Sequence, residues 1–157
     1  MVKAQNYCAY DDFMFSMGIG ISVTNLDVGS ASPVGMAFDF NVFKFHFDFA
    51  TNLASGKGDE LDFSSSETTK SDKQGWYSIN FGYIFDLNNN WYIVPKVGCI
   101  VRQDIWEDPI GWNTYYEENA GTKVQCGAEI IKKINNFYLR ASCCTTEIFS
   151  CGIGLAF

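Results

Sequence analysis

The sequence predicts an all-β protein that folds as an eight-stranded antiparallel up-and-down transmembrane β-barrel. Apolar residues recur at every second position in eight segments that are separated by turn-forming residues. The connections between these segments alternate between short and long. The last segment, 149–157, ends in an aromatic residue and carries only Ser, Gly and Ala between its apolar positions. Such a bare face suits a crowded barrel interior, whereas a soluble sheet would show charged residues to water there.

Length and composition narrow the alternatives. The chain has 157 residues, of which 17% are aromatic and three are proline, and its net charge is −7. This length fits one domain, which we place at 13–157 after an N-terminal extension at 1–12. No run of about 18 apolar residues occurs, which excludes a transmembrane helix. The negative charge argues against a nucleic-acid partner, and we expect no cofactor and no metal.

Four segments form the N-terminal half of the predicted barrel. In each of them Phe, Met, Ile, Val or Tyr alternates with Ser, Gly, Ala or charged residues. The apolar parity switches across Asn41 and Val42, so we expect a tight turn at 41–42. These segments cover 13–24, 34–40, 43–50 and 75–86.

Four further segments form the C-terminal half. A run of three asparagines at 88–90 precedes the first of them and predicts a turn. Pro95 lies within that first segment and has no N–H to donate, so we expect a bulge there. These segments cover 91–102, 122–131, 137–144 and 149–157.

The lengths of the connections give the predicted barrel a direction. Short connections lie near 41–42, 87–90 and 133–136, whereas the other side holds 25–33, 52–74, 103–120 and 145–147. Short periplasmic turns opposite longer external loops are typical of outer-membrane barrels, which also place both termini on one side.

Aromatic residues gather at the short-turn end, where an interfacial girdle is expected. They are Phe13, Phe43, Phe85, Trp91, Phe137 and Phe157. The main alternative is a soluble lipocalin-like barrel that binds an apolar ligand in its core, with these rings turned inward.

Charged residues occupy the parity opposite to the apolar one and are therefore predicted to line the lumen. Eight strands leave an interior just wide enough for side chains to fill, so an open channel is not expected. Buried charges must be paired, and both signs are present. The predicted lumen charge network comprises Asp39, Lys44, His46, Asp48, Lys96, Arg102, Lys123, Glu129 and Arg140.

The single histidine raises one enzymatic alternative. His46 and Asp48 share a face, and Ser78 or Ser142 could lie across the barrel, which would suit a lumen acyltransferase or hydrolase. A filled lumen near the short-turn end offers no entry for substrate. We therefore expect a non-enzymatic protein with no catalytic residue.

The segment 103–120 is the strongest candidate for an interaction surface. It contains acidic residues but no Lys or Arg, and aromatic residues lie between the acids. Exposed aromatic residues with charge are typical of binding hot spots, although they can also anchor a barrel at the interface. Clustered carboxylates can also hold calcium, but no calcium-binding spacing is present. The candidates are Trp106, Glu107, Asp108, Trp112, Tyr115, Tyr116, Glu117 and Glu118.

The polar segment 52–74 carries no recognisable motif but adds to the same side of the predicted barrel. The six cysteines show no metal-binding spacing and are expected to act as small apolar residues within strands. A disulfide between Cys99 and Cys126 requires one particular register of the strands at 91–102 and 122–131.

Taken together, these residues resemble the small eight-stranded outer-membrane barrels of the OmpX/Ail and OmpA-transmembrane type. The resemblance covers 13–157 in pattern rather than identity. The segments 35–40 and 43–49 are also similar to outer-membrane barrels of Bacteroides-like bacteria. The closing segment resembles the signal that the barrel-assembly machinery reads in this class, carried here by Phe149, Ile153, Leu155 and Phe157.

The resemblance implies a bacterial outer-membrane location, with outer-membrane lipid and the barrel-assembly machinery as partners. Members of the class act in adhesion, envelope integrity or complement evasion through their loops, which implies an extracellular partner for 52–74 and 103–120. Residues 1–5 have no apolar core, so no export signal is visible, and we expect that one was removed.

Overall fold

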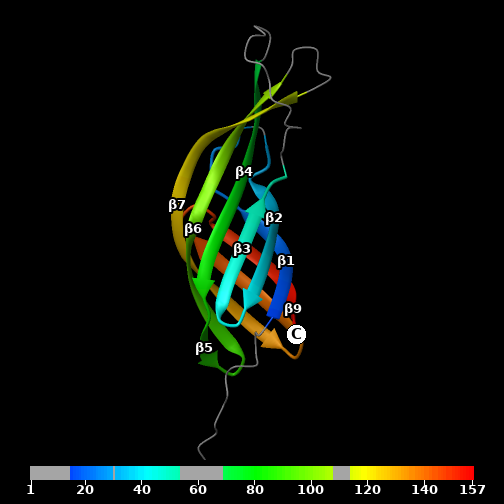
Figure 1. Ribbon diagram of the computed structural model, residues 1–157, viewed down its shortest axis with the longest axis vertical. Coiled ribbons are helices and arrows are strands. Elements are labelled where there is room, and N and C mark those ends of the chain that lie inside the picture. Colours follow the sequence, from blue (N-terminus) through cyan, green and yellow to red (C-terminus); the bar gives the residue numbers. More distant parts are fainter. Residues whose placement is uncertain (1–14, 30, 54–68, 108–113) are drawn as a thin grey trace, which may run out of the picture.

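The computed structural model describes residues 15–29, 31–53, 69–107 and 114–157. In these residues the chain forms antiparallel strands that close into a barrel (Figure 1). No helix within the described ranges is long and apolar enough to span a bilayer. The strands are β1 (Phe15–Val23), β2 (Val34–Val42), β3 (Phe45–Thr51), β4 (Thr69–Tyr83), β5 (Phe85–Asn88), β6 (Trp91–Glu107), β7 (Thr114–Ile134), β8 (Phe137–Cys144) and β9 (Phe149–Ala156).

The barrel wall counts as eight-stranded, because β4 and β5 form one continuous strand that is interrupted only at Ile84. Strands that are consecutive along the chain pair with each other, and β9 pairs with β1 to close the barrel. At this seam Gly18 lies opposite Gly154 and Gly20 opposite Gly152. A methyl group at Gly154 would overlap the ring of Tyr138, so the bare inner face of the seam makes room for a large side chain from β8.

The outer wall is apolar. On β1, β2, β3, β8 and β9 the buried and exposed positions alternate, and the exposed set is dominated by Phe, Ile, Leu, Met and Val. Phe45 and Phe81 stack across β3 and β4, with ring centroids 5.8 Å apart. Large apolar side chains on the outside and charged side chains buried inside are the reverse of a lipocalin, so the soluble lipocalin-like alternative is wrong. The chain is a transmembrane β-barrel.

Three layers of side chains fill the interior. An apolar layer near the short turns consists of Ile84, Tyr92, Val94, Ile131, Tyr138 and Ala156. A second apolar layer at the opposite end consists of Leu26, Val28, Ala37, Ala50, Trp76 and Ile100. Leu26 and Val28 belong to the connection between β1 and β2, which therefore folds inward over the barrel. Polar and charged side chains lie between the two layers.

Two local predictions require correction. The first tight turn lies at Phe43–Lys44 rather than 41–42, and Phe43 has a positive φ of 55°. The register runs through Pro95 without a shift, so no bulge forms there. The neighbouring strand is interrupted instead, at Ile84 between β4 and β5. The N–H of Ile84 donates to the carbonyl of Lys44. This break is consistent with the missing donor at Pro95.

Strands β4, β6 and β7 are longer than predicted and continue past the rest of the barrel, at the top of Figure 1. The segment 103–120 was predicted as a loop, but β6 extends to Glu107 and β7 begins at Thr114. Gln103 pairs with Asn119 and Thr69 pairs with Glu107. The three strands thus form a small sheet at the long-loop end, which we call the protruding sheet (69–75, 101–107 and 114–125).

Candidate functional site

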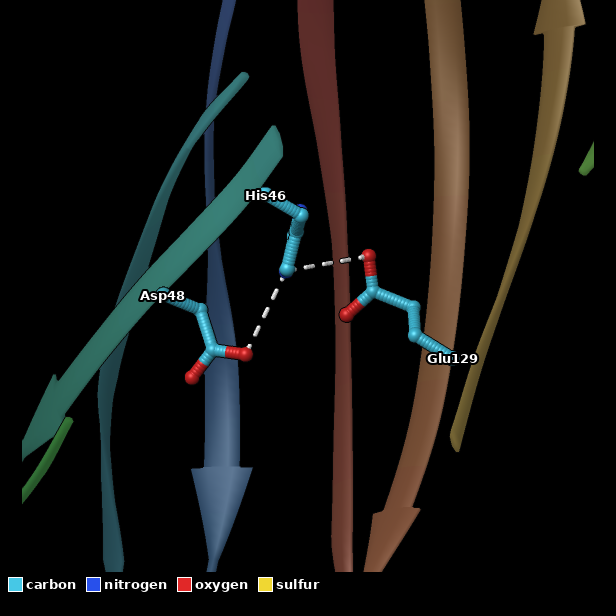
Figure 2. Close-up of side chains that lie close together, drawn as sticks. All are labelled: His46, Asp48 and Glu129. Atoms are coloured by element: carbon cyan, nitrogen blue, oxygen red, sulfur yellow. Dashed lines mark hydrogen bonds and ion pairs between the residues drawn. The ribbon is translucent and has the colours of Figure 1, made fainter. Parts of the chain in front are cut away.

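His46 occupies the middle layer of the lumen and is fully buried. Its Nδ1 lies 2.6 Å from Oδ1 of Asn41, which is the residue opposite it on β2. Its Nε2 lies 3.3 Å from Oδ2 of Asp48 and 3.7 Å from Oε1 of Glu129 (Figure 2). Asp48 follows two residues later on β3 and shares the inward face, whereas Glu129 reaches across the lumen from β7.

Two cations neutralise these carboxylates. Lys96 Nζ lies 2.5 Å from Asp48 Oδ2 and 3.5 Å from Glu129 Oε2, and it donates to Ser142 Oγ at 3.1 Å. Arg140 Nε lies 2.5 Å from Asp39 Oδ1, and its Nη1 lies 3.3 Å from Glu129 Oε2. All of these charged side chains are nearly or fully buried, so each charge depends on its partners for stability.

Two further residues extend the network toward the ends of the barrel. Tyr138, in the apolar layer near the short turns, donates its hydroxyl to Asp39. Toward the long-loop end, the buried Glu147 accepts from Ser78 at 2.7 Å and from Asn80 at 3.4 Å. Its backbone N–H donates to Gln125 at 3.0 Å. The network therefore ties the connection between β8 and β9 to the opposite wall.

The arrangement does not suit metal binding. Donor atoms of His46, Asp48 and Glu129 lie within 4.8 Å of one another. However, Lys96 already contacts the Asp48 oxygen that faces the ring, and Lys96 and Arg140 both contact Glu129. A divalent cation would have to share these oxygens with two buried positive charges.

The arrangement does not form a nucleophile–base pair either. Ser142 accepts from Lys96, and Ser78 donates to Glu147. The ring nitrogens of His46 instead face an amide oxygen and carboxylates. The histidine also lies between two apolar layers of side chains. The alternative of an acyltransferase or hydrolase that uses His46 lacks the required geometry.

The structure brings six of the nine predicted lumen charges into one cluster: Asp39, His46, Asp48, Lys96, Glu129 and Arg140. Lys44 is exposed instead, because it lies in the turn. Lys123 is exposed because β8 ends at Cys144, opposite Gly127, and leaves that part of β7 above the closed barrel. Arg102 is half-buried at the same level, opposite Gly121.

Sequence reasoning missed three members of the network. The switch of parity places Asn41 in a turn, which hides its inward position. Tyr138 lies at an inward position of its predicted strand, but the predicted network consists of charged residues. Glu147 falls in a predicted external connection, where its position as an acid between two strand ends is the one available signal.

The predicted interaction residues lie on the protruding sheet or outside the described residues. The backbones of Trp106 and Glu107 belong to β6, and those of four others belong to β7: Tyr115, Tyr116, Glu117 and Glu118. Asp108 and Trp112 lie outside the described residues, as does most of 52–74.

The closing strand and the cysteines face mainly outward. Phe149, Ile153, Leu155 and Phe157 are all exposed on the outer wall, where lipid and assembly factors have access. Among the described cysteines, all five are free. Cys99 lies opposite Val124, and Cys126 lies opposite Val97. The register therefore offsets the two cysteines by two residues, which does not favour the disulfide that the sequence left open.

The closed eight-stranded barrel, its apolar outer wall and its filled lumen with buried charges define the class: the fold is that of the small outer-membrane β-barrels. No protein-family model and no curated protein sequence matches this chain. Among solved structures, the chain is similar to Ail, the attachment invasion locus protein of Yersinia pestis, with a TM-score of 0.55 and 14% identity over 93% of this chain and 99% of Ail.

A second structure of Ail, in complex with the heparin analogue sucrose octasulfate, gives a TM-score of 0.53 and 16% identity over 91% of this chain and 96% of Ail. Neisserial surface protein A aligns with a TM-score of 0.42 and 14% identity over 91% of this chain and 94% of that protein. At these identities the similarity to Ail establishes the fold.

Proposed function

We propose that this chain is a non-enzymatic protein of the bacterial outer membrane that binds an extracellular partner through its protruding sheet. The proposal is supported chiefly by the length of β4, β6 and β7. Strand β4 continues past its last pair with β3, Thr51–Tyr77, and β7 continues past its last pair with β8, Gly127–Cys144. Sheet edges of this kind can accept a strand from another chain.

The charge of the β6–β7 hairpin beyond Arg102 favours a basic partner. Its strands contain Glu107, Glu117 and Glu118 there and no Lys or Arg, whereas Asp104 is buried. The solved complex of Ail contains a sulfated ligand. A sulfated ligand on the acidic hairpin of this chain would meet like charges, whereas a Lys- or Arg-rich segment would meet opposite charges.

The test compares two probes, polylysine and sucrose octasulfate, on the purified protein in detergent. We expect polylysine to bind and sucrose octasulfate not to bind at low salt. The triple variant Glu107→Gln, Glu117→Gln and Glu118→Gln removes these acids from the hairpin strands and should abolish polylysine binding. The matched control Asp86→Asn removes an exposed acid at the other end of the barrel and should leave binding intact.

Polylysine binding that survives in the triple variant would contradict the proposed surface. The barrel of this variant should still show heat-modifiable migration on a gel, since the closed part of each strand is untouched.

For the location, fractionation of cells that express the chain behind an export signal should recover it with the outer membrane. Recovery from the soluble fraction would contradict the proposal.

A further inference from the structure

The middle layer of the lumen is one positive charge short. Three acids meet there, Asp39, Asp48 and Glu129, and two permanent cations meet them, Lys96 and Arg140. Glu147 is a further buried acid, but it lies toward the long-loop end, outside this layer, and accepts hydrogen bonds from the neutral side chains of Ser78 and Asn80. Excess charge in a sealed interior is costly. The layer therefore needs one more positive charge.

The contacts of His46 identify where that charge lies. The amide nitrogen of Asn41 points to Ser16 Oγ at 2.8 Å and to Asp39 Oδ2 at 3.5 Å, and a carboxylate can only accept. The amide oxygen of Asn41 therefore faces Nδ1 of the ring. At the other side of the ring, Nε2 faces carboxylate oxygens of Asp48 and Glu129. Both ring nitrogens thus face acceptors, which requires a hydrogen on each.

We propose that the lumen holds a bound proton on His46, and that this proton completes the charge balance that keeps the barrel interior closed. With the ring doubly protonated, three cations oppose the three acids of the middle layer. The apolar layers above and below separate this proton from water.

A proton fits this position better than a metal ion. A divalent ion would give the layer four positive charges against three negative ones. It would also compete with Lys96 for Asp48 Oδ2, which the ammonium contacts at 2.5 Å. Glu129 Oε1 has no hydrogen-bond partner but lies 3.7 Å from Nε2, within reach of the proton that the ring carries there.

Polar groups from every strand of the barrel wall surround the middle layer. They are Ser16 (β1), Asp39 and Asn41 (β2), Asp48 (β3), Asn80 (β4), Lys96 (β6), Glu129 (β7), Tyr138, Arg140 and Ser142 (β8), Ser150 (β9) and Glu147 from the β8–β9 connection.

The chain has one histidine, so nitrogen-15 labelling of histidine gives a single ring to observe. In the intact protein in detergent at about pH 7, where free histidine is mostly neutral, we expect both ring nitrogens to show the chemical shift of protonated nitrogen. A bare nitrogen signal would overturn the proposal. Addition of Zn²⁺ should leave the ring signals unchanged, and a zinc-dependent shift would show a metal site instead.

Changing the opposing acid tests the balance itself. In Glu129→Gln two acids remain against Lys96 and Arg140, so His46 should give up its second proton and show one bare nitrogen at the same pH. The control Lys44→Gln removes a charge from the exposed turn and should not alter the ring. A ring that stays doubly protonated in Glu129→Gln would overturn the proposed coupling.

Stability supplies a second readout. His46→Gln leaves an uncompensated acid and should lower the folding equilibrium constant on the order of 100-fold. The double variant His46→Gln with Glu129→Gln removes one charge of each sign and should recover most of that loss. A double variant that is as unstable as the sum of the single variants would show that His46 only fills space.

Discussion

The closed part of the barrel and the protruding sheet use the same strands in opposite ways. Within the barrel, β4, β6 and β7 each have two neighbours, and their inward side chains are buried in apolar layers or in the charge network. Above the ends of β3 and β8, the same strands leave the closed wall. Closure of the wall fixes the structure of these strands, whereas their extension past β3 and β8 is where we propose that a partner binds. Substitutions should therefore affect stability in the first region and binding in the second.

The largest effect is expected from Lys96→Met. This change removes the ammonium that Asp48 and Glu129 contact and leaves buried carboxylates without it. We expect a loss of about 3–5 kcal/mol in the free energy of unfolding, measured by denaturant titration of the protein refolded in lipid. The control Lys123→Met, at an exposed position of β7, should change it by about 0.5 kcal/mol or less. Equal losses in both variants would contradict the expected difference in stability between the closed barrel and the protruding sheet.

A smaller loss is expected from filling the bare face of the seam. Gly154→Val places a branched side chain against the ring of Tyr138, which cannot move freely because Asp39 accepts its hydroxyl. We expect about 1–3 kcal/mol of destabilisation. The control Ala141→Val makes a comparable change on the exposed outer wall and should be close to neutral. Heat-modifiable gel migration at rising temperature ranks the two variants.

Tyr138→Phe tests a single hydrogen bond of the network. The ring still fills its place between β8 and the seam, but Asp39 loses the hydroxyl donor and keeps Arg140. A hydrogen bond to a charged group contributes about 1.5–3 kcal/mol, so we expect a loss in the lower part of that range. Tyr83→Phe, on the exposed outer face, provides the control and should leave the free energy of unfolding unchanged in the same titration.

The smallest effect on stability is expected in the protruding sheet. Glu118 belongs to the part of β7 that lies beyond its last pair with β8. Glu118→Gln should therefore change the free energy of unfolding by no more than about 0.5 kcal/mol, while it weakens polylysine binding. A large loss of stability from this substitution would mean that the sheet belongs to the structural part of the molecule.

Much of the barrel was predictable because the period of two is a local property of a strand. Strand β8 was predicted with its observed bounds, and β9 to within one residue. The errors came where a neighbouring strand decides the outcome. The upper parts of β6 and β7 are polar and lack the apolar alternation, so their pairing depends on the partner strand rather than on their own sequence. The position of the first turn was missed because Phe43, an unusual residue for a positive φ, occupies it.

The sequence by itself determined the number of barrel strands, the face of each strand that meets lipid and the presence of charges inside. Each of these follows from the alternation of apolar and polar residues and from the lengths of the connections. The tertiary structure decided which charges meet. The arrangement of the strands around the barrel brings His46 to Glu129 and Lys96 to Asp48. The shorter β8 leaves Lys123 in solvent. The structure also turned Glu147 and the β1–β2 connection inward. These outcomes depend on distances between segments far apart in the chain, and no local pattern encodes such distances.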